Sequence, residues 1–149
     1  EQPEWDGKHL ITYGISQGGG QALVAAGLDP RVSATVAIVP AFCNIEDEVN
    51  GWPGMGKVTP NSKQAETVAQ TVRYFDAVNF SMRSKAETLI AVGLVDTTCP
   101  PPGILAAYNQ VKATKQLVSV ADKGHHQMSV PNADLRRIYD SFIREHTQD

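Results

Sequence analysis

The sequence has little cysteine, no excess of positive charge and no long apolar run, and each absence excludes a class of protein. Two cysteines, Cys43 and Cys99, are too few for a disulfide framework or a metal site. They could still form one disulfide bridge, so they do not determine the cellular compartment of the protein. The 13 Lys and Arg residues are scattered and the net charge is -3, whereas nucleic-acid binding needs a concentrated positive face. No apolar run approaches the roughly 18 residues of a membrane-spanning helix. We therefore expect neither nucleic acid nor a membrane as a partner.

An initiator Met and a signal peptide are also lacking at the start of the sequence. Residues Glu1–Gly7 are turn-like and lead directly into a β-rich run. This beginning predicts that the chain starts inside a larger protein. The chain itself has 149 residues, of which 42% are hydrophobic, and this is enough for one domain with a core but too little for two.

Apolar runs alternate with helical patterns along the chain. The runs at 34–39 and 89–95 are continuously apolar, which favours strands covered on both faces of a parallel sheet. Two further strands are predicted at 9–13 and 116–120, and helices are predicted at 23–28, 62–73, 103–112 and 132–146. The order strand–helix occurs four times, so the sequence predicts a parallel α/β sheet with right-handed crossovers.

The segment 41–60 interrupts this alternation with three glycines and two prolines. We interpret it as a long loop over the mouth of the site. A surface excursion without a function fits the composition equally well.

A nucleophile elbow is predicted at Gly14–Gly18, which fits the pattern G-x-S-x-G around Ser16. In such an elbow the serine occupies a strained turn between a strand and a helix, and a glycine two residues away on either side allows close backbone packing. A β-rich run precedes this motif and an Ala-rich segment follows it. The alternative is a Gly-rich loop that binds phosphate at a helix N-terminus, but the spacing of a P-loop or of G-x-G-x-x-G is missing.

Asp96 and His125 complete the chain order Ser, Asp, His that is typical of hydrolases with this elbow. Each follows an apolar run, and active sites of open parallel sheets lie at the carboxyl ends of the strands. Three prolines, Pro100–Pro102, predict a stiff loop that holds Asp96 in place. The alternative for Asp96 is a turn cap, and for His125 a solvated loop side chain.

Other residues compete for two of these roles. His126 adjoins His125, but successive side chains point in different directions, so only one can meet Ser16. Asp122 competes with Asp96, although it shares a short loop with the histidine. The two remaining histidines, His9 and His146, are poorly placed, because one opens a strand and the other lies near the terminus.

The chemistry of these residues predicts acyl transfer. His125 takes the proton of Ser16, which attacks an acyl carbonyl, and Asp96 orients the imidazole. The backbone N–H of Gln17 is expected to donate to the oxyanion. No metal or cofactor is needed for this reaction.

Several stretches of the sequence resemble the acetyl xylan esterase / cephalosporin-C deacetylase family, carbohydrate esterase family seven. The similar stretches, which extend over nearly the whole chain, are 13–19, 28–32, 73–80, 92–96 with 99–101, 106–109 and 124–125. The resemblance implies the C-terminal half of an α/β-hydrolase domain, with strands five to eight side by side. It also implies deacetylation of xylo-oligosaccharides and small acetyl esters, with Ser16, Asp96 and His125 as the triad, and assembly into hexamers in many members.

The sequence departs from this family at Ile15, where Gly is common, and at His126, where Glu is common. The family's first half, which carries an Arg-Gly-Gln stretch and the Tyr of the second oxyanion donor, has no matching position. The chain is therefore expected to work with a missing N-terminal half or with another copy of itself. Three alternatives stay open: a prolyl-oligopeptidase-type peptidase, a dienelactone-hydrolase-like enzyme, and a catalytically silent assembly unit.

Overall fold

A parallel four-stranded sheet forms the centre of the computed structural model, which describes residues 5–45 and 62–147. Its strands are β1 (Ile11–Ile15), β2 (Ala34–Ile38), β3 (Glu87–Gly93) and β4 (Lys115–Val120). They lie in the order β1-β2-β3-β4, and every neighbouring pair is parallel. The predicted parallel sheet, with strands adjacent in chain order, is therefore confirmed.

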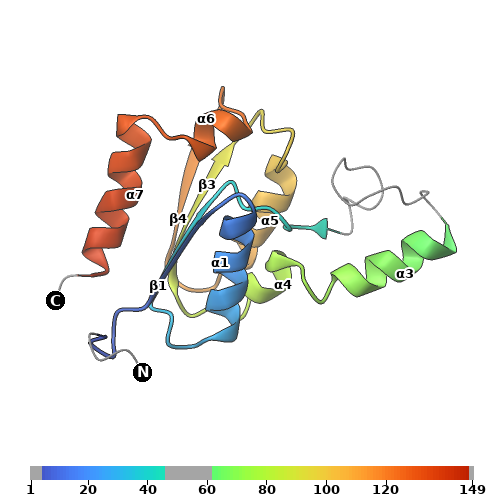
Figure 1. Cartoon of the computed structure of the whole chain (residues 1–149), viewed down its shortest axis with the longest axis horizontal. Coiled ribbons are helices and arrows are strands. Elements are labelled where there is room, and N and C mark those ends of the chain that lie inside the picture. The colour runs from blue at the N-terminus through green and yellow to red at the C-terminus, as the bar shows by residue number, and fades with distance from the viewer. Residues whose placement is uncertain (1–4, 46–61, 148–149) are drawn as a thin grey trace.

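Helices cover both faces of this sheet (Figure 1). Helix α7 lies on one side of it, and α1, α4 and α5 lie on the other. The described helices are α1 (Gln17–Leu28), α3 (Lys63–Val72), α4 (Ala77–Ser81), α5 (Pro101–Gln110), α6 (His125–Ser129) and α7 (Ala133–Glu145). Helix α3 extends away from the sheet (Figure 1).

Burial explains why the two central strands are the most apolar. All residues of β2 are buried, and so is every residue of β3 after Glu87. Helix α7 contributes Leu135, Tyr139 and Phe142 to the same core, whereas Ile138 of the predicted apolar stripe is 38% exposed. The edge strands β1 and β4 are only partly covered.

Strands β1 and β3 each begin and end two residues away from the predicted bounds, 9–13 and 89–95. Strand β1 begins at Ile11 rather than His9, because the Asp6 side chain accepts hydrogen bonds from the backbone N–H groups of Lys8 and His9 and folds this segment into a turn. Strand β3 ends at Gly93, so Leu94 and Val95 form an exposed turn before Asp96 instead of continuing the strand.

Helices α1 and α5 also differ from their predicted bounds, 23–28 and 103–112. Helix α1 begins at Gln17 and includes three glycines; α5 begins at Pro101, so two of the three prolines form its first turn rather than a loop. The short helices α4 and α6 were not predicted, because five residues are too few to show a helical period. Most of the predicted loop 41–60 lies outside the described residues.

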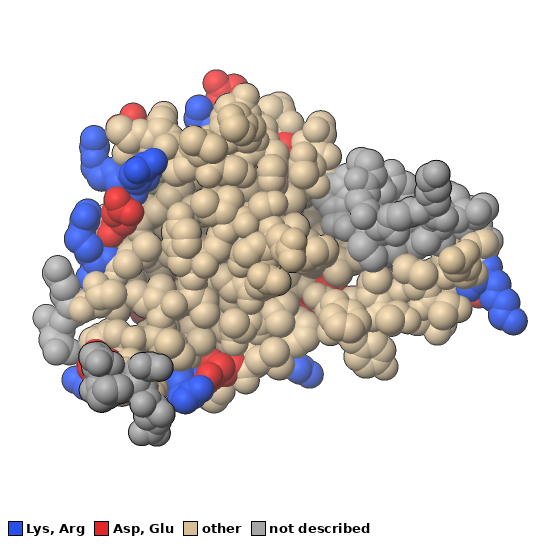
Figure 2. Space-filling view, viewed as in Figure 1, with Lys and Arg blue, Asp and Glu red and all other residues tan. Residues whose placement is uncertain are grey.

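The charged side chains do not form a face of one sign in the view of Figure 2. Along the edge formed by α7, Lys and Arg side chains stand beside Asp and Glu side chains, and the centre of this face carries few charges. None of the described helices combines the length and the apolar character that crossing a membrane would require.

Candidate active site

Ser16 occupies a strained turn between β1 and α1. Its backbone angles are φ 57° and ψ -120°, in the left-handed half of conformational space that non-glycine residues rarely adopt. Three hydrogen bonds hold the turn: Ser16 N–H donates to Ile38 O (2.8 Å), and Ser16 O accepts from Gly20 N–H (3.1 Å) and Ala41 N–H (2.9 Å). The predicted strand-to-helix elbow is therefore present, with its serine at the carboxyl end of β1.

The glycines of the motif are required to different degrees. A Cβ atom on Gly14 would lie 2.0 Å from Gly18 O, and one on Gly20 would lie 2.2 Å from Ala41 O. A Cβ atom on Gly18 would meet no described atom within 4 Å. The expectation that both glycines of G-x-S-x-G serve close packing is thus correct for Gly14 and wrong for Gly18 within the described part of the chain.

Asp96 divides its two carboxylate oxygens between two tasks. Its side chain is buried, and Oδ1 accepts from the N–H groups of Thr98 and Cys99, both at 2.8 Å. Oδ2 lies 2.8 Å from Nδ1 of His125. The turn-cap hypothesis and the triad hypothesis for this residue are consequently both consistent with the geometry.

His125 is the first residue of α6 and connects the other two side chains. Its Nε2 lies 3.0 Å from Ser16 Oγ while its Nδ1 contacts Asp96. Because a carboxylate only accepts hydrogen bonds, Nδ1 carries the proton in this arrangement and Nε2 accepts from the serine hydroxyl. Gly124 precedes the helix, and its N–H donates to the Gln127 side chain (3.2 Å), which fixes the turn that presents His125.

The competing residues lie elsewhere. His126 is exposed, and Asp122 is exposed in the turn before α6. His9 pairs with Asp6 at the start of the described chain. His146 contacts Phe142 O and Glu87 at the end of α7. The structure therefore brings Ser16, His125 and Asp96 together in one hydrogen-bonded chain; their catalytic roles remain a prediction.

Gln17 is the first residue of α1. The N–H groups in the first turn of a helix have no acceptor within the helix, so the Gln17 N–H lies beside the nucleophile without an intrahelical partner. This position suits the predicted oxyanion donor.

In the described part of the chain, no cluster of three or more His, Cys, Asp or Glu residues could hold a metal ion. The cysteines Cys43 and Cys99 are buried and not joined by a disulfide.

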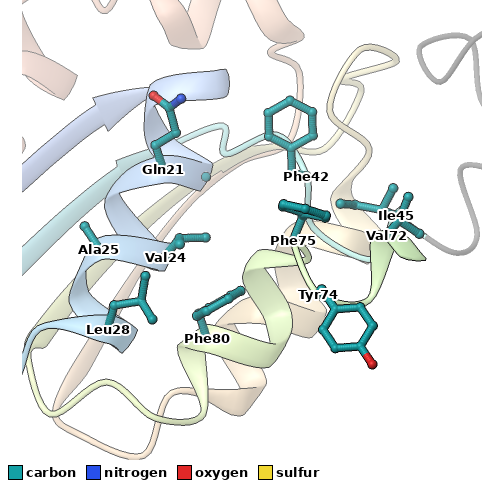
Figure 3. A pocket seen from close by; sticks show the side chains of 11 residues that line it. Gln21, Val24, Ala25, Leu28, Phe42, Ile45, Val72, Tyr74, Phe75 and Phe80 are labelled. Carbon is teal, nitrogen blue, oxygen red and sulfur yellow. The ribbon is translucent and has the colours of Figure 1, made fainter. Parts of the chain in front are cut away.

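An apolar groove of about 720 Å³ runs beside α1 but does not include the three side chains above. Figure 3 shows Val24 and Leu28 of α1 facing Phe75 and Phe80 across it.

The backbone of Ala41 also contacts the elbow, because its N–H donates to Ser16 O, and the sequence analysis gave it no role. Backbone contacts of this kind leave no pattern of side chains in a sequence.

Comparison with known proteins identifies relatives that are named acetyl esterases and acetyl xylan esterases. The acetyl esterase Axe7A of Xylanibacter ruminicola is 36% identical over 134 residues, which cover 87% of this chain and 30% of the relative. Acetyl xylan esterase 1 from Thermoanaerobacterium sp. JW/SL YS485 superposes with a TM-score of 0.87 at 28% identity, over 99% of this chain and 49% of that structure. The acetyl xylan esterase from Paenibacillus sp. R4 gives 0.85 at 33% identity, over 97% and 48%.

The chain thus spans about half the length of these two structures and 30% of the length of Axe7A. Both structures match the sheet and the helices of this chain, so its fold is part of an α/β-hydrolase fold. The family model for acetyl xylan esterase (AXE1) matches residues 1–141, and the chain belongs to this family.

Proposed function

We propose that this chain carries the catalytic centre of a serine esterase that removes acetyl groups from acetylated xylan, xylo-oligosaccharides and small acetyl esters. The observation that carries the proposal is the hydrogen-bonded chain from Asp96 through His125 to Ser16. It occurs at the carboxyl edge of a parallel sheet, in a member of the acetyl xylan esterase family.

The geometry supports a two-step acyl transfer. Ser16 Oγ attacks the acetyl carbonyl carbon while its proton passes to Nε2 of His125, and the resulting oxyanion accepts a hydrogen bond from Gln17 N–H. The imidazolium then gives its proton to the sugar oxygen, which leaves as an alcohol, and the acetyl group stays on Ser16. Water, deprotonated by His125, releases acetate and restores the serine. Asp96 keeps the imidazole oriented throughout.

We further propose that the chain is the C-terminal part of one α/β-hydrolase domain and that the active unit contains more polypeptide than these 149 residues. Two observations support this: the relatives are about twice as long or longer, and Gln17 is one donor where an oxyanion hole normally has two. The second donor then comes from a preceding segment or from a second copy of the chain.

Hydrolysis of p-nitrophenyl acetate, butyrate and octanoate and of a prolyl anilide tests the proposal. We expect acetate to be the preferred ester and release of acetate from acetylated xylan. The measurement is made on this chain and on a longer polypeptide that contains it. Cleavage of the anilide would favour the peptidase alternative, and equal or faster turnover of octanoate would favour a lipase-like enzyme. Activity of the longer polypeptide alone agrees with the proposal, whereas activity that persists in its Ser16→Ala variant would make this chain an assembly unit.

A further inference from the structure

The loop that follows β2 has an unusual backbone. This post-β2 loop, Val39–Ile45, contains three non-glycine residues with positive φ: Val39 (40°), Phe42 (59°) and Asn44 (63°). Such conformations are unfavourable for residues with a Cβ atom and persist only where the surroundings hold them. The groups that hold this loop are therefore of interest.

The post-β2 loop touches both halves of the candidate active site. On one side, Ala41 N–H donates to Ser16 O (2.9 Å), and Ala41 O lies so close to Gly20 that a Cβ atom there would be 2.2 Å away. On the other side, Cys43 O lies equally close to Gly103, in the first turn of α5. That turn begins two residues after Cys99, whose N–H donates to Asp96. A shift of the loop would thus displace the backbone that carries the nucleophile and the backbone beside the acid.

Asp76, which lies 31 residues after Ile45, fastens the end of this loop. Its carboxylate is buried and accepts three backbone N–H groups: Asn44 to Oδ1 (3.0 Å), Ile45 to Oδ2 (2.7 Å) and Val78 to Oδ1 (2.9 Å). Next to it, Ala77 N–H donates to Phe42 O (2.8 Å). Only the bond from Val78 is needed to cap α4. The two remaining bonds are directed at the strained end of the loop.

We propose that Asp76 is a positioning residue for the Ser16 nucleophile, acting through the post-β2 loop; this inference rests on the esterase function proposed above. Bonds from N–H groups to an ionised carboxylate are stronger than those to a neutral acceptor. Removal of the carboxylate leaves the Asn44 and Ile45 N–H groups without this acceptor, and the loop then relaxes toward ordinary backbone angles. The bond from Ala41 to Ser16 O moves with the loop.

The test compares Asp76→Ala and Asp76→Asn with Asp29→Ala in the same polypeptide. Asp29 is a matched control, because it also organises a turn by accepting a backbone N–H, that of Arg31, but it lies at the far end of α1. A fluorophosphonate probe first titrates the reactive serines, and kcat and KM for p-nitrophenyl acetate are then expressed per titrated site. We expect Asp76→Ala to lower kcat on the order of 10- to 100-fold with little change in KM, and Asp29→Ala to keep kcat within about twofold.

Asp76→Asn covers the case in which the alanine variant does not fold. Its oxygen still accepts from Asn44 and Val78, while its amide group faces the Ile45 N–H, so a smaller loss of kcat is expected. In the unmodified protein, the Asn44 and Ile45 amides should exchange slowly with solvent.

The outcomes separate the two proposals. Wild-type kcat per titrated serine in a folded Asp76 variant, or fast exchange of both amides, would overturn the role of Asp76 alone. A wild-type protein that is neither labelled at Ser16 nor active on acetyl esters would overturn the proposed function, and this inference with it.

Discussion

The strained backbone of Ser16 is the single-residue feature that most favours a nucleophile. A non-glycine residue at φ 57° costs on the order of 1–3 kcal/mol. Its backbone bonds to Ile38, Gly20 and Ala41 hold it there, and the result is a hydroxyl aimed at Nε2 of His125. Strained backbone conformations occur often at active sites, and this one points the Ser16 hydroxyl at an imidazole nitrogen.

Replacement of this hydroxyl is the first prediction. Ser16→Ala should lower kcat on acetyl esters on the order of 10⁴-fold or more, because the proposed acyl intermediate forms on Ser16 Oγ. Thermal unfolding should change little, because the three backbone hydrogen bonds that hold Ser16 remain in the variant. A phosphonate probe and peptide mapping should locate the label on Ser16. Label on another serine, with activity kept in Ser16→Ala, would contradict the assignment.

The adjacent histidines give the second prediction, with a built-in control. His125→Ala should lose nearly as much activity as Ser16→Ala, since Nε2 of His125 is the group that contacts Ser16 Oγ. His126→Ala should keep most of the activity, because this neighbour is exposed. Both rates are measured on p-nitrophenyl acetate. A loss confined to His126→Ala would move the base by one position.

The residues of the site could be predicted from the sequence because each follows a strand. Ser16, Asp96 and His125 come after β1, β3 and β4, and parallel strands end at the same edge of a sheet. The post-β2 loop and Asp76 could not be given a role, because their contacts join distant backbone groups. An Asp before a helix predicts only an N-cap. Asp76 does cap α4, but its further bonds to the loop cannot be predicted from this position.

At the scale of elements, burial decided which predictions were accurate. Continuous apolar runs identified β2 and β3, both buried on two faces, but could not show where β3 ends. Leu94 and Val95 are as apolar as the strand before them, yet they are 43% and 56% exposed. The helix starts at Ser62 and Asn132 were predicted within a residue, and both residues are of types that commonly cap a helix N-terminus with their side chains.

Helix α1 provides the third prediction, on how the elbow packs. Gly18 and Gly20 both lie in its first turns, so replacement by Ala gives both the same gain in helix propensity, up to about 1 kcal/mol. Gly20→Ala should still destabilise the chain by about 1–3 kcal/mol, because its Cβ would lie 2.2 Å from Ala41 O. Gly18→Ala should be neutral or stabilising. Urea unfolding measures the free energy of unfolding of both variants. Equal changes in this free energy would show that the post-β2 loop does not pack closely against α1.

At the scale of the molecule, the sheet has an edge at β1. Strand β1 pairs with β2 alone among the described strands, and its central residue Tyr13 is 49% exposed. Partial burial is the main cause that raises the pKa of Tyr13, and the negative charge of Asp140 on α7 is the second. The effect of Asp140 shows that the Tyr13 side chain lies beside α7. Burial also raises the pKa of Tyr139, to about 12. Unpaired edges recruit other strands unless charge or proline blunts them, and β1 has neither.

The final prediction follows from this edge: the 149 residues alone should self-associate through β1. Two copies related by a two-fold axis would place β1 against β1 in antiparallel fashion, with the two Tyr13 side chains near each other at the centre. Tyr13→Lys would then set two like charges in proximity, and we expect it to weaken association roughly tenfold, or about 1.4 kcal/mol.

Tyr74→Lys is the matched control, because Tyr74 is 78% exposed and lies beside the apolar groove. Sedimentation equilibrium over a range of concentrations measures both variants. Dissociation by Tyr74→Lys alone would place the contact on the groove, and a monomer with full esterase activity would show that neither a further segment nor a second copy is needed.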